Sequence, residues 1–302
     1  FSIVDKVESK SFSSICDIAD VRDTESLSKV LNADDMIINL AAEHRDDVTP
    51  KTLYDDVNVQ GARNVCEVAE QKGINTIIFT SSVAVYGFAP LGTDESGEIN
   101  HFNDYGRTKY EAELVYKAWQ EKDTDNRKLV IVRPTVVFGE QNRGNVYNLL
   151  RQIASGKFMM IGDGTNRKSM AYVENVAAFL EYSLGFNNGV HIYNYIDKPD
   201  FDMNTLVKNV NKALGKDKKI GFRLPFFMGY GIGKVFDLVA VLTGKKFTVS
   251  SIRIKKFCSD SLFDTSIERS GFVRPVKLED GLASTIKHEF VEKNEGELFY
   301  SE

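Results

Sequence analysis

FTSSVAVYG (residues 79–87) and YGRTK (105–109) frame the most informative part of the chain. The first motif begins as a buried apolar strand that ends in hydroxyl side chains, and the second opens a predicted helix. Because residues four apart share one helix face, the side chains of Tyr105 and Lys109 lie about 6 Å apart along the helix axis. Ser82 follows the strand and faces the crevice where open α/β sheets hold their ligands.

This combination of hydroxyl, phenol and amine indicates removal of an alcohol proton. A free phenol has a pKa near ~10, and a neighbouring ammonium group favours the phenolate and lowers that pKa. We therefore predict that Tyr105 is a general base near neutral pH, assisted by Lys109 and Ser82. A Tyr and a Lys four apart also occur by chance, so the prediction depends on the hydroxyl-ended strand that precedes them.

Composition excludes several classes of protein. The 302 residues are 42% hydrophobic and 27% charged, which is typical of a soluble globular chain. A net charge of −5 argues against general nucleic-acid binding. Three scattered cysteines and four unpaired histidines predict reduced thiols in a cytoplasmic protein and no metal site. No signal peptide is visible at Phe1.

Strands that alternate with helices predict an α/β fold, a Rossmann-like doubly wound parallel sheet with a smaller mixed α/β lobe. We expect a dinucleotide-binding domain over residues 1–143 and a substrate lobe over 144–302, with part of 165–198 returning to the first domain. A short strand ends at Asp5, where such sheets carry the acid that binds the adenosine ribose. No glycine-rich turn precedes it, so we expect about 30 residues of this fold to be missing before Asp5.

Several motifs resemble a known family. In order they are NLAAEHRDD (39–47), NVQGARNV (58–65), FTSSVAVYG, YGRTK, RPTVVFG (133–139) and KSMAYVENV (168–176). They resemble the extended short-chain dehydrogenase/reductases of the sugar epimerase and dehydratase group. LAAEHRDDV, GEQNRGNVYNLLRQIASGKFMM and SSIRIKKFC are more closely similar to the bacterial N-acetylglucosaminyl-diphosphoundecaprenol 4-epimerases of O-antigen and lipopolysaccharide synthesis.

The resemblance implies NAD as the cofactor and Tyr105, Lys109 and Ser82 as the catalytic residues. The implied cofactor contacts comprise a ribose acid, two adenine contacts, a small-residue wall, a helix asparagine and the nicotinamide side. They are Asp5, Asp20, Val21, Leu40, Ala41, Ala42, Asn58, Thr80, Tyr105, Lys109, Pro134 and Val136. From chemistry alone, Asn58 is equally consistent with a plain helix-start residue.

Polar and cationic groups beside glycine-containing loops are candidates for the substrate diphosphate. Together with Ser82 they are Arg143, Asn145, Arg167 and Lys168. Solvated loop charges are the alternative interpretation. Lys168 stands where sugar-nucleotide epimerases usually have arginine, and a lysine neutralises a diphosphate without a bidentate fork.

Residues 211–258 contain eleven Lys and Arg against two Asp, a local charge of +9. Between these cations lies the apolar segment LPFFMGYGIGKVFDLVAVLTG (224–244). It is interrupted by three glycines, Lys234 and Asp237, which is too often for a comfortable membrane span. A cationic border around an apolar segment suits the surface of an anionic membrane. We expect peripheral contact with the inner face of the cytoplasmic membrane, where a lipid-linked sugar arrives; a core helix with solvated lysines is the alternative.

The predicted function is NAD-dependent 4-epimerisation of N-acetylglucosaminyl-diphosphoundecaprenol through a 4-keto intermediate. Three alternatives stay open: an epimerase of UDP-N-acetylglucosamine or UDP-glucose, a UDP-sugar 4-ketoreductase, and a catalytically silent NAD-binding regulator. The resemblance also implies a homodimer through the helices at 58–71 and 105–120.

Overall fold

The computed structural model describes residues 1–45, 48–216, 221–244 and 250–292. Its central sheet has four parallel strands in the order β3-β4-β5-β9. Their bounds are Ile37–Asn39 (β3), Thr76–Thr80 (β4), Lys128–Pro134 (β5) and Gly189–Tyr195 (β9). All seven residues of β5 are buried, as expected for a strand covered on both faces. The predicted parallel, doubly wound sheet is confirmed.

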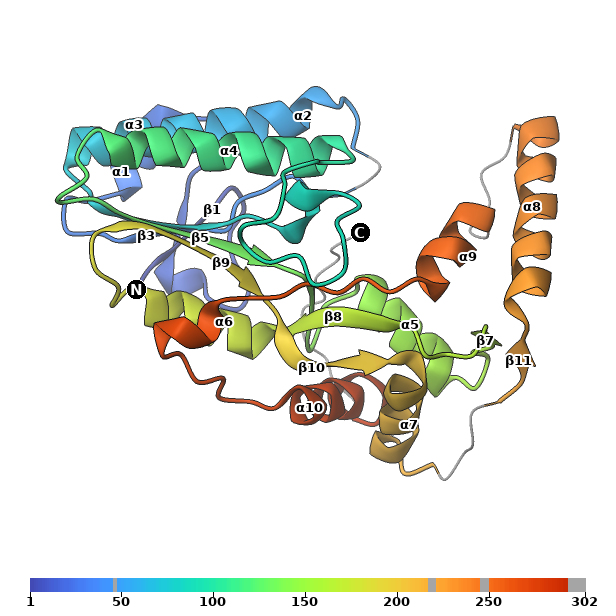
Figure 1. Cartoon of the computed structure of the whole chain (residues 1–302). Helices are drawn as coiled ribbons and strands as arrows, with labels where there is room; N and C mark the ends of the chain where they lie inside the picture. The colour runs from blue at the N-terminus through green and yellow to red at the C-terminus, as the bar shows by residue number, and fades with distance from the viewer. Residues whose placement is uncertain (46–47, 217–220, 245–249, 293–302) are drawn as a thin grey trace.

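Helices cover both faces of this sheet (Figure 1). On one face lie α1 (Thr24–Val30), α3 (Gly61–Lys72) and α4 (Asp104–Glu121), and on the other lies α6 (Val173–Ser183). A short helix α2 (Thr52–Tyr54) runs through a π-helical stretch, Asp55–Gln60, into α3. Trp119 and Phe179 are fully buried on opposite faces, so each helix layer has its own apolar core.

Strands β1 (Ile3–Asp5) and β2 (Cys16–Ile18) pair in parallel but form a separate two-stranded sheet. Within the described ranges they make no ladder with the four-stranded sheet, although Val4 and Ala19 pack into the same core as α1 and α3. The further strand and glycine loop that we expect before Asp5 stay a prediction.

The second lobe is built on the mixed sheet β10-β8-β6. Its strands are Val136–Phe138 (β6), Arg167–Tyr172 (β8) and Asp197–Asp202 (β10), and β7 (Met160–Ile161) pairs with β11 (Arg223–Leu224). Helices α5 (Asn145–Ala154), α7 (Met203–Ala213) and α10 (Leu278–Phe290) enclose its apolar core. Both α6 and β9 belong to the first lobe although they follow β8 in sequence.

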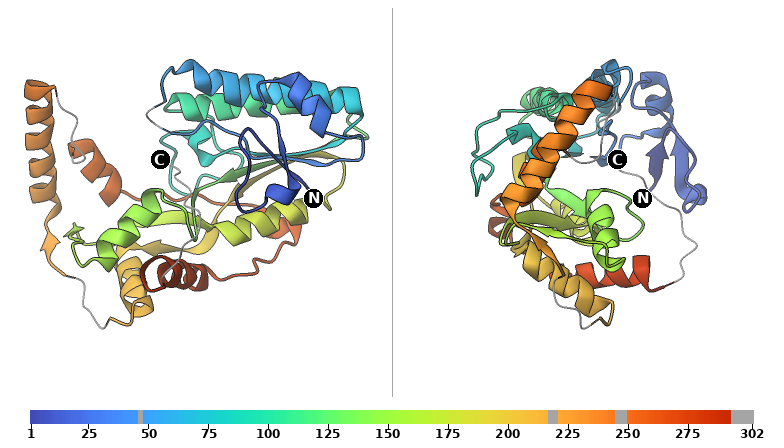
Figure 2. Two further views of the ribbon diagram at one scale, coloured as in Figure 1. Left: turned by 180° about the vertical axis from the view of Figure 1, so that it is seen from behind. Right: turned by 90° about the vertical axis from the view of Figure 1, so that its right-hand side faces the viewer.

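Helix α9 (Ser251–Cys258) packs on the core of the second lobe through Phe257, and α8 (Phe226–Thr243) contributes no residue to either core. The left view in Figure 2 shows α8 at one side of the molecule, away from the central sheet. Its inner stripe is small and polar: a Cβ on Gly233 would lie 2.7 Å from the Ser251 backbone, and Asp237 accepts a 2.5 Å hydrogen bond from the Ser251 hydroxyl. The three glycines and two charges therefore do not interrupt this helix, contrary to our expectation.

A buried ion pair ties α4 to the central sheet. Arg133 of β5 donates to both carboxylate oxygens of Glu113, at 2.8 and 2.5 Å, and the two side chains are 3% and 0% exposed. Arg133 also donates to the Tyr86 hydroxyl at 2.6 Å. Two charges held in a bidentate geometry satisfy one another, but either one alone would be stranded in a low-dielectric core.

We therefore expect Arg133→Met to lower the free energy of unfolding by about 3–5 kcal/mol, because it leaves the Glu113 carboxylate without its partner. Adding Glu113→Leu removes the stranded charge and should recover most of the loss. Urea denaturation followed by circular dichroism measures both variants. A double variant less stable than Arg133→Met would contradict this account.

Candidate active site

The site lies where the parallel strands end. β4 ends at Thr80 and β5 at Pro134, and the segment Leu40–Ala42 follows β3, so the carboxyl ends of three neighbouring strands meet at one edge. Thr80 donates to the Asn39 carbonyl at 2.9 Å, which joins the ends of β4 and β3. Open α/β sheets hold ligands at this edge.

Ser82 and Tyr105 come together here, close enough for the Ser82 hydroxyl to lower the pKa of the phenol. Tyr105 is in the first turn of α4, which Asn103 caps by accepting from the Gly106 amide at 2.9 Å. The close approach depends on Gly106, because a Cβ there would lie 2.5 Å from the Ala84 carbonyl oxygen. A role for Gly106 was not predicted from the sequence, although its position directly after Tyr105 could have indicated one.

Lys109 lies one turn further along α4 and is only 2% exposed. Its ammonium is 4.2 Å from the centroid of the Phe79 ring. Burial lowers the pKa of Lys109 to about 7, and the negative charge of Glu113 partly opposes this shift. The amine is therefore poised to exchange a proton near neutral pH.

The pKa of Tyr105 moves in the opposite direction to our prediction. Burial raises it, and the hydrogen bond from Ser82 lowers it by a smaller amount. A low dielectric penalises the phenolate as it penalises the ammonium of Lys109, so the spacing of the two residues does not by itself acidify the phenol. The prediction that Lys109 lowers the pKa of the Tyr105 phenol is therefore wrong when only the groups of the protein are considered.

The predicted helix asparagine has a structural role. The Asn58 amide accepts from the Glu43 backbone at 2.8 Å and donates to the Glu43 carbonyl at 3.0 Å and the Thr108 hydroxyl at 2.9 Å. These bonds hold the segment after β3 against α4. Thr108 was not singled out in the sequence, and the expected contact of Asn58 with the cofactor stays a prediction.

The predicted adenosine side lies around the β1–β2 sheet. The Asp5 carboxylate accepts from the Val7 amide at 3.0 Å. Asp20 forms an ion pair with Arg22 at 2.6 Å, and this partner lowers the pKa of the Asp20 carboxyl. The carbonyl of Val21 accepts from Asn64, which fixes the loop that contains both predicted adenine contacts.

The four predicted diphosphate residues have different surroundings. Arg143 is paired with Glu289 and stacks 4.1 Å from the Tyr147 ring centroid. Lys168 donates to the carbonyls of Lys256 and Ser259 at 2.9 and 2.6 Å, so it caps the end of α9, and burial lowers its pKa. These protein contacts do not support a diphosphate role for Arg143 or Lys168. For Asn145 and Arg167 that role stays a prediction.

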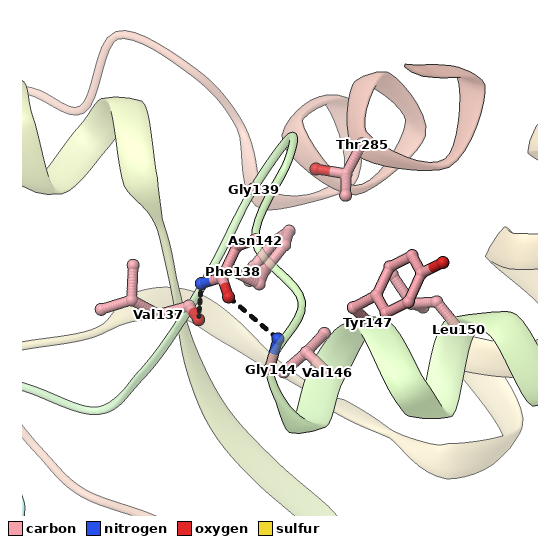
Figure 3. Close-up of a pocket in the computed structure, with 9 residues that line it drawn as sticks. All are labelled: Val137, Phe138, Gly139, Asn142, Gly144, Val146, Tyr147, Leu150 and Thr285. Carbon is pink, nitrogen blue, oxygen red and sulfur yellow. Dashed lines mark hydrogen bonds between the residues drawn. The ribbon is translucent and has the colours of Figure 1, made fainter. Parts of the chain in front are cut away.

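A small pocket beside β6 and α5 is distinct from this site (Figure 3). Asn142 closes its loop by donating to the Val137 carbonyl at 3.4 Å and accepting from the Gly144 amide at 2.9 Å. None of the three predicted catalytic residues lines it. Among the described residues no cluster of His, Cys, Asp and Glu could hold a metal ion.

Comparison with known proteins identifies the family. Residues 5–195 match the model of the NAD dependent epimerase/dehydratase family. The chain belongs to this family. It is 50% identical to the N-acetyl-alpha-D-glucosaminyl-diphospho-ditrans,octacis-undecaprenol 4-epimerase of Escherichia coli O157:H7 over 98% of the chain and 90% of that protein. It is also 30% identical to the UDP-glucose 4-epimerase of Vibrio cholerae, over 65% of the chain and 61% of that protein.

Solved structures share the fold. The UDP-glucose 4-epimerase of Thermotoga maritima matches with a TM-score of 0.70 and 19% identity, covering 94% of this chain and 89% of that one. The UDP-Glc/GlcNAc 4-epimerase of Campylobacter jejuni matches with a TM-score of 0.70 and 18% identity, covering 96% and 90%.

NAD is the cofactor of this family, and the site fits it. Leu40 is 61% exposed and is followed by two alanines, which leaves an apolar wall at the sheet edge for a flat group. The buried hydroxyl of Ser81 has no hydrogen-bond partner among the described residues. An orphaned buried donor of this kind is costly unless a ligand satisfies it.

The lowered pKa of Lys109 predicts how the free energy of unfolding depends on pH. From about pH 7 up to its ordinary value of 10.5, the unfolded chain binds a proton at this amine that the folded chain does not, so the free energy of unfolding rises with pH in that window. In Lys109→Met this rise disappears. We expect the wild type to gain about 3 kcal/mol more than the variant between pH 7 and about 9.5.

Urea denaturation at several pH values measures this difference. Lys208→Met on the exposed surface of α7 is the matched control and should behave as the wild type. Parallel pH dependence in the wild type and Lys109→Met would refute the lowered pKa.

Proposed function

We propose that this chain is an NAD-dependent 4-epimerase that interconverts N-acetylglucosaminyl- and N-acetylgalactosaminyl-diphosphoundecaprenol. The observation that carries the proposal is that Ser82 and Tyr105 come together at the strand ends of a family member, one helical turn from the buried Lys109. We infer the lipid-linked substrate from the name of the relative in Escherichia coli O157:H7, which states that substrate.

In this proposal Tyr105 removes the proton from the C4 hydroxyl, and Ser82 hydrogen-bonds the same oxygen. NAD+, when bound, would supply the acceptor for the C4 hydride and the donor that gives it back to the opposite face of the sugar. Its positive charge would favour the phenolate of Tyr105 and so oppose the burial that raises the pKa of this residue. Lys109 changes its charge near neutral pH and so relays a proton at the phenol.

The proposed cofactor contacts at the strand ends are Leu40, Ala41, Ala42, Asn58, Thr80, Pro134 and Val136. On the adenosine side they are Asp5, Asp20 and Val21. Val136 is 41% exposed, which suits a residue that covers a nicotinamide ring. Purified protein that epimerises without added NAD separates this function from a 4-ketoreductase, which consumes reduced cofactor.

Tyr105→Phe keeps the ring and removes the base, so we expect epimerase turnover to fall by about 10²–10⁴-fold. The measurement is conversion of N-acetylglucosaminyl-diphosphoundecaprenol, with sugar analysis of the product and NAD content determined on the same sample. Tyr110→Phe, one turn along the same helix, is the matched control and should keep full turnover. Full turnover in Tyr105→Phe would overturn the catalytic assignment, whereas full biological activity of a variant without turnover would revive a silent regulatory role.

We further propose that α8 rests on an anionic membrane. Among the described residues it is the one helix long and apolar enough to cross a bilayer, with a mean hydropathy of 1.5. Five of its eight exposed large apolar side chains are 60–82% exposed and form a broad stripe on the side away from Gly229 and Gly233. They are Phe227, Val235, Leu238, Val241 and Leu242.

Its attachment to the body favours a helix that lies on the surface. Asp237 is bonded to Ser251, and Gly233 touches the backbone of the same residue, so leaving α9 for the bilayer core would break buried contacts. Lys218, Lys219, Lys245 and Lys246 of the predicted cationic border lie outside the described residues. The proposed location is the cytoplasmic face of the membrane, and the homodimer through α3 and α4 also remains a proposal.

Val241→Glu puts a charge at the most exposed point of this stripe, so we expect about tenfold weaker binding to vesicles, or ~1.4 kcal/mol. Flotation with phosphatidylglycerol and with phosphatidylcholine vesicles measures it, and the wild type should favour the anionic lipid. Val273→Glu is the matched control, because Val273 is also 82% exposed but lies outside α8. Equal recovery of wild type and Val241→Glu would remove the proposal.

A further inference from the structure

Two exposed aromatic rings and a lysine meet between the lobes. Phe88 and Phe102 pack edge to face with ring centroids 4.5 Å apart. The ammonium of Lys256, on α9, lies 5.4 Å from the first ring centroid and 5.1 Å from the second. Both rings belong to the loop between Ser82 and α4, so this contact joins the catalytic segment to α9.

The rings remain largely in solvent despite this contact. Phe88 is 66% exposed and Phe102 is 60% exposed. A cation over aromatic faces stabilises an exposed site only weakly, which does not account for leaving two phenylalanines uncovered. Exposed apolar groups that adjoin a charge are typical of a surface that binds an amphipathic ligand.

The position of the cluster relates it to the catalytic residues. Phe102 is separated from Tyr105 only by the capping residue Asn103 and by Asp104, and Phe88 follows the turn that begins at Ser82. A ligand whose reacting carbon is at Tyr105 would therefore extend past these rings.

Helix α9 continues the same surface towards α8. Ser251 and Ile254 are buried on its inner face, whereas Ile252 is 59% exposed and shares the outer face with Lys256, four residues further on. The inner face packs against Gly233 of α8. Aromatic rings of the catalytic loop, the cation of α9 and aliphatic side chains thus lie on one surface between the catalytic segment and the exposed apolar helix.

We infer that Phe88, Phe102 and Lys256 bind the diphosphate–prenyl junction of the substrate. Lys256 pairs with the diphosphate, the two rings cover the first isoprene unit, and Ile252 leads the chain towards α8. The charges are complementary, and a cation in contact with two exposed apolar rings combines the two chemistries that meet at a diphosphate–prenyl junction. This inference rests on the proposed function and adds the residues that distinguish a lipid-linked from a nucleotide-linked sugar.

The test combines kinetics with a binding probe. On N-acetylglucosaminyl-diphosphoundecaprenol we expect Lys256→Gln and the double variant Phe88→Ala/Phe102→Ala each to raise KM about tenfold, with kcat within twofold of the wild type. Lys256→Arg keeps the charge and should keep KM within about threefold. Lys208→Gln, on α7, is the matched control for the loss of one exposed lysine.

Calorimetric titration of the full chain with farnesyl diphosphate and with inorganic diphosphate separates the two parts of the site. We expect Lys256→Gln to weaken both probes, and the double phenylalanine variant to weaken farnesyl diphosphate about tenfold while leaving inorganic diphosphate unchanged. Variants that bind both probes as the wild type does, or that keep KM, overturn the inference. A wild type that does not epimerise the lipid-linked sugar refutes the proposed function instead, and the titration then decides the inference by itself.

Discussion

The bidentate pair of Glu113 and Arg133 anchors α4 on the central sheet, and the geometry of the site depends on that anchor. It acts in the middle of the helix, while the first turn is fixed by the approach of Gly106 to Ala84. With α4 fixed at these two points, Tyr105, next to Gly106, has little freedom to move away from Ser82. A catalytic pair held from both sides needs no reorganisation when the substrate arrives, which is the preorganisation that acid–base catalysis requires.

The same anchor sets the electrostatics. Glu113 is one turn from Lys109 and supports its charge, but Arg133 already neutralises that carboxylate. Lys109 therefore experiences mainly its own burial, and its pKa falls instead of acidifying the phenol. Deprotonation of Tyr105 in such a site needs a positive charge from outside the protein, and an oxidised nicotinamide carries one. The chemistry is thereby coupled to the presence of the cofactor.

The sequence was sufficient for the parts of the site that depend on local spacing. Tyr105 and Ser82 follow from a strand end and a helix start, and the parallel sheet follows from strands that alternate with helices. Contacts between distant segments were not predictable: Lys168 was expected to bind diphosphate but caps α9, about 90 residues away in the chain. The pKa of Tyr105 was missed for a related reason, since burial is set by the packing of the whole lobe.

The glycines of α8 show that one residue type can either weaken a helix or let it pack closely against a neighbour. In sequence, Gly229, Gly231 and Gly233 suggested a broken segment, because glycine weakens helices. In the structure the first and last of them lie one turn apart and let the helix backbone approach β7 and α9 closely. Small residues on the inner stripe push the bulky apolar side chains outward, which is the reverse of an ordinary surface helix. A helix attached by its small face has its apolar face available for a bilayer, and the same attachment joins that face to α9 and the rings beside Tyr105.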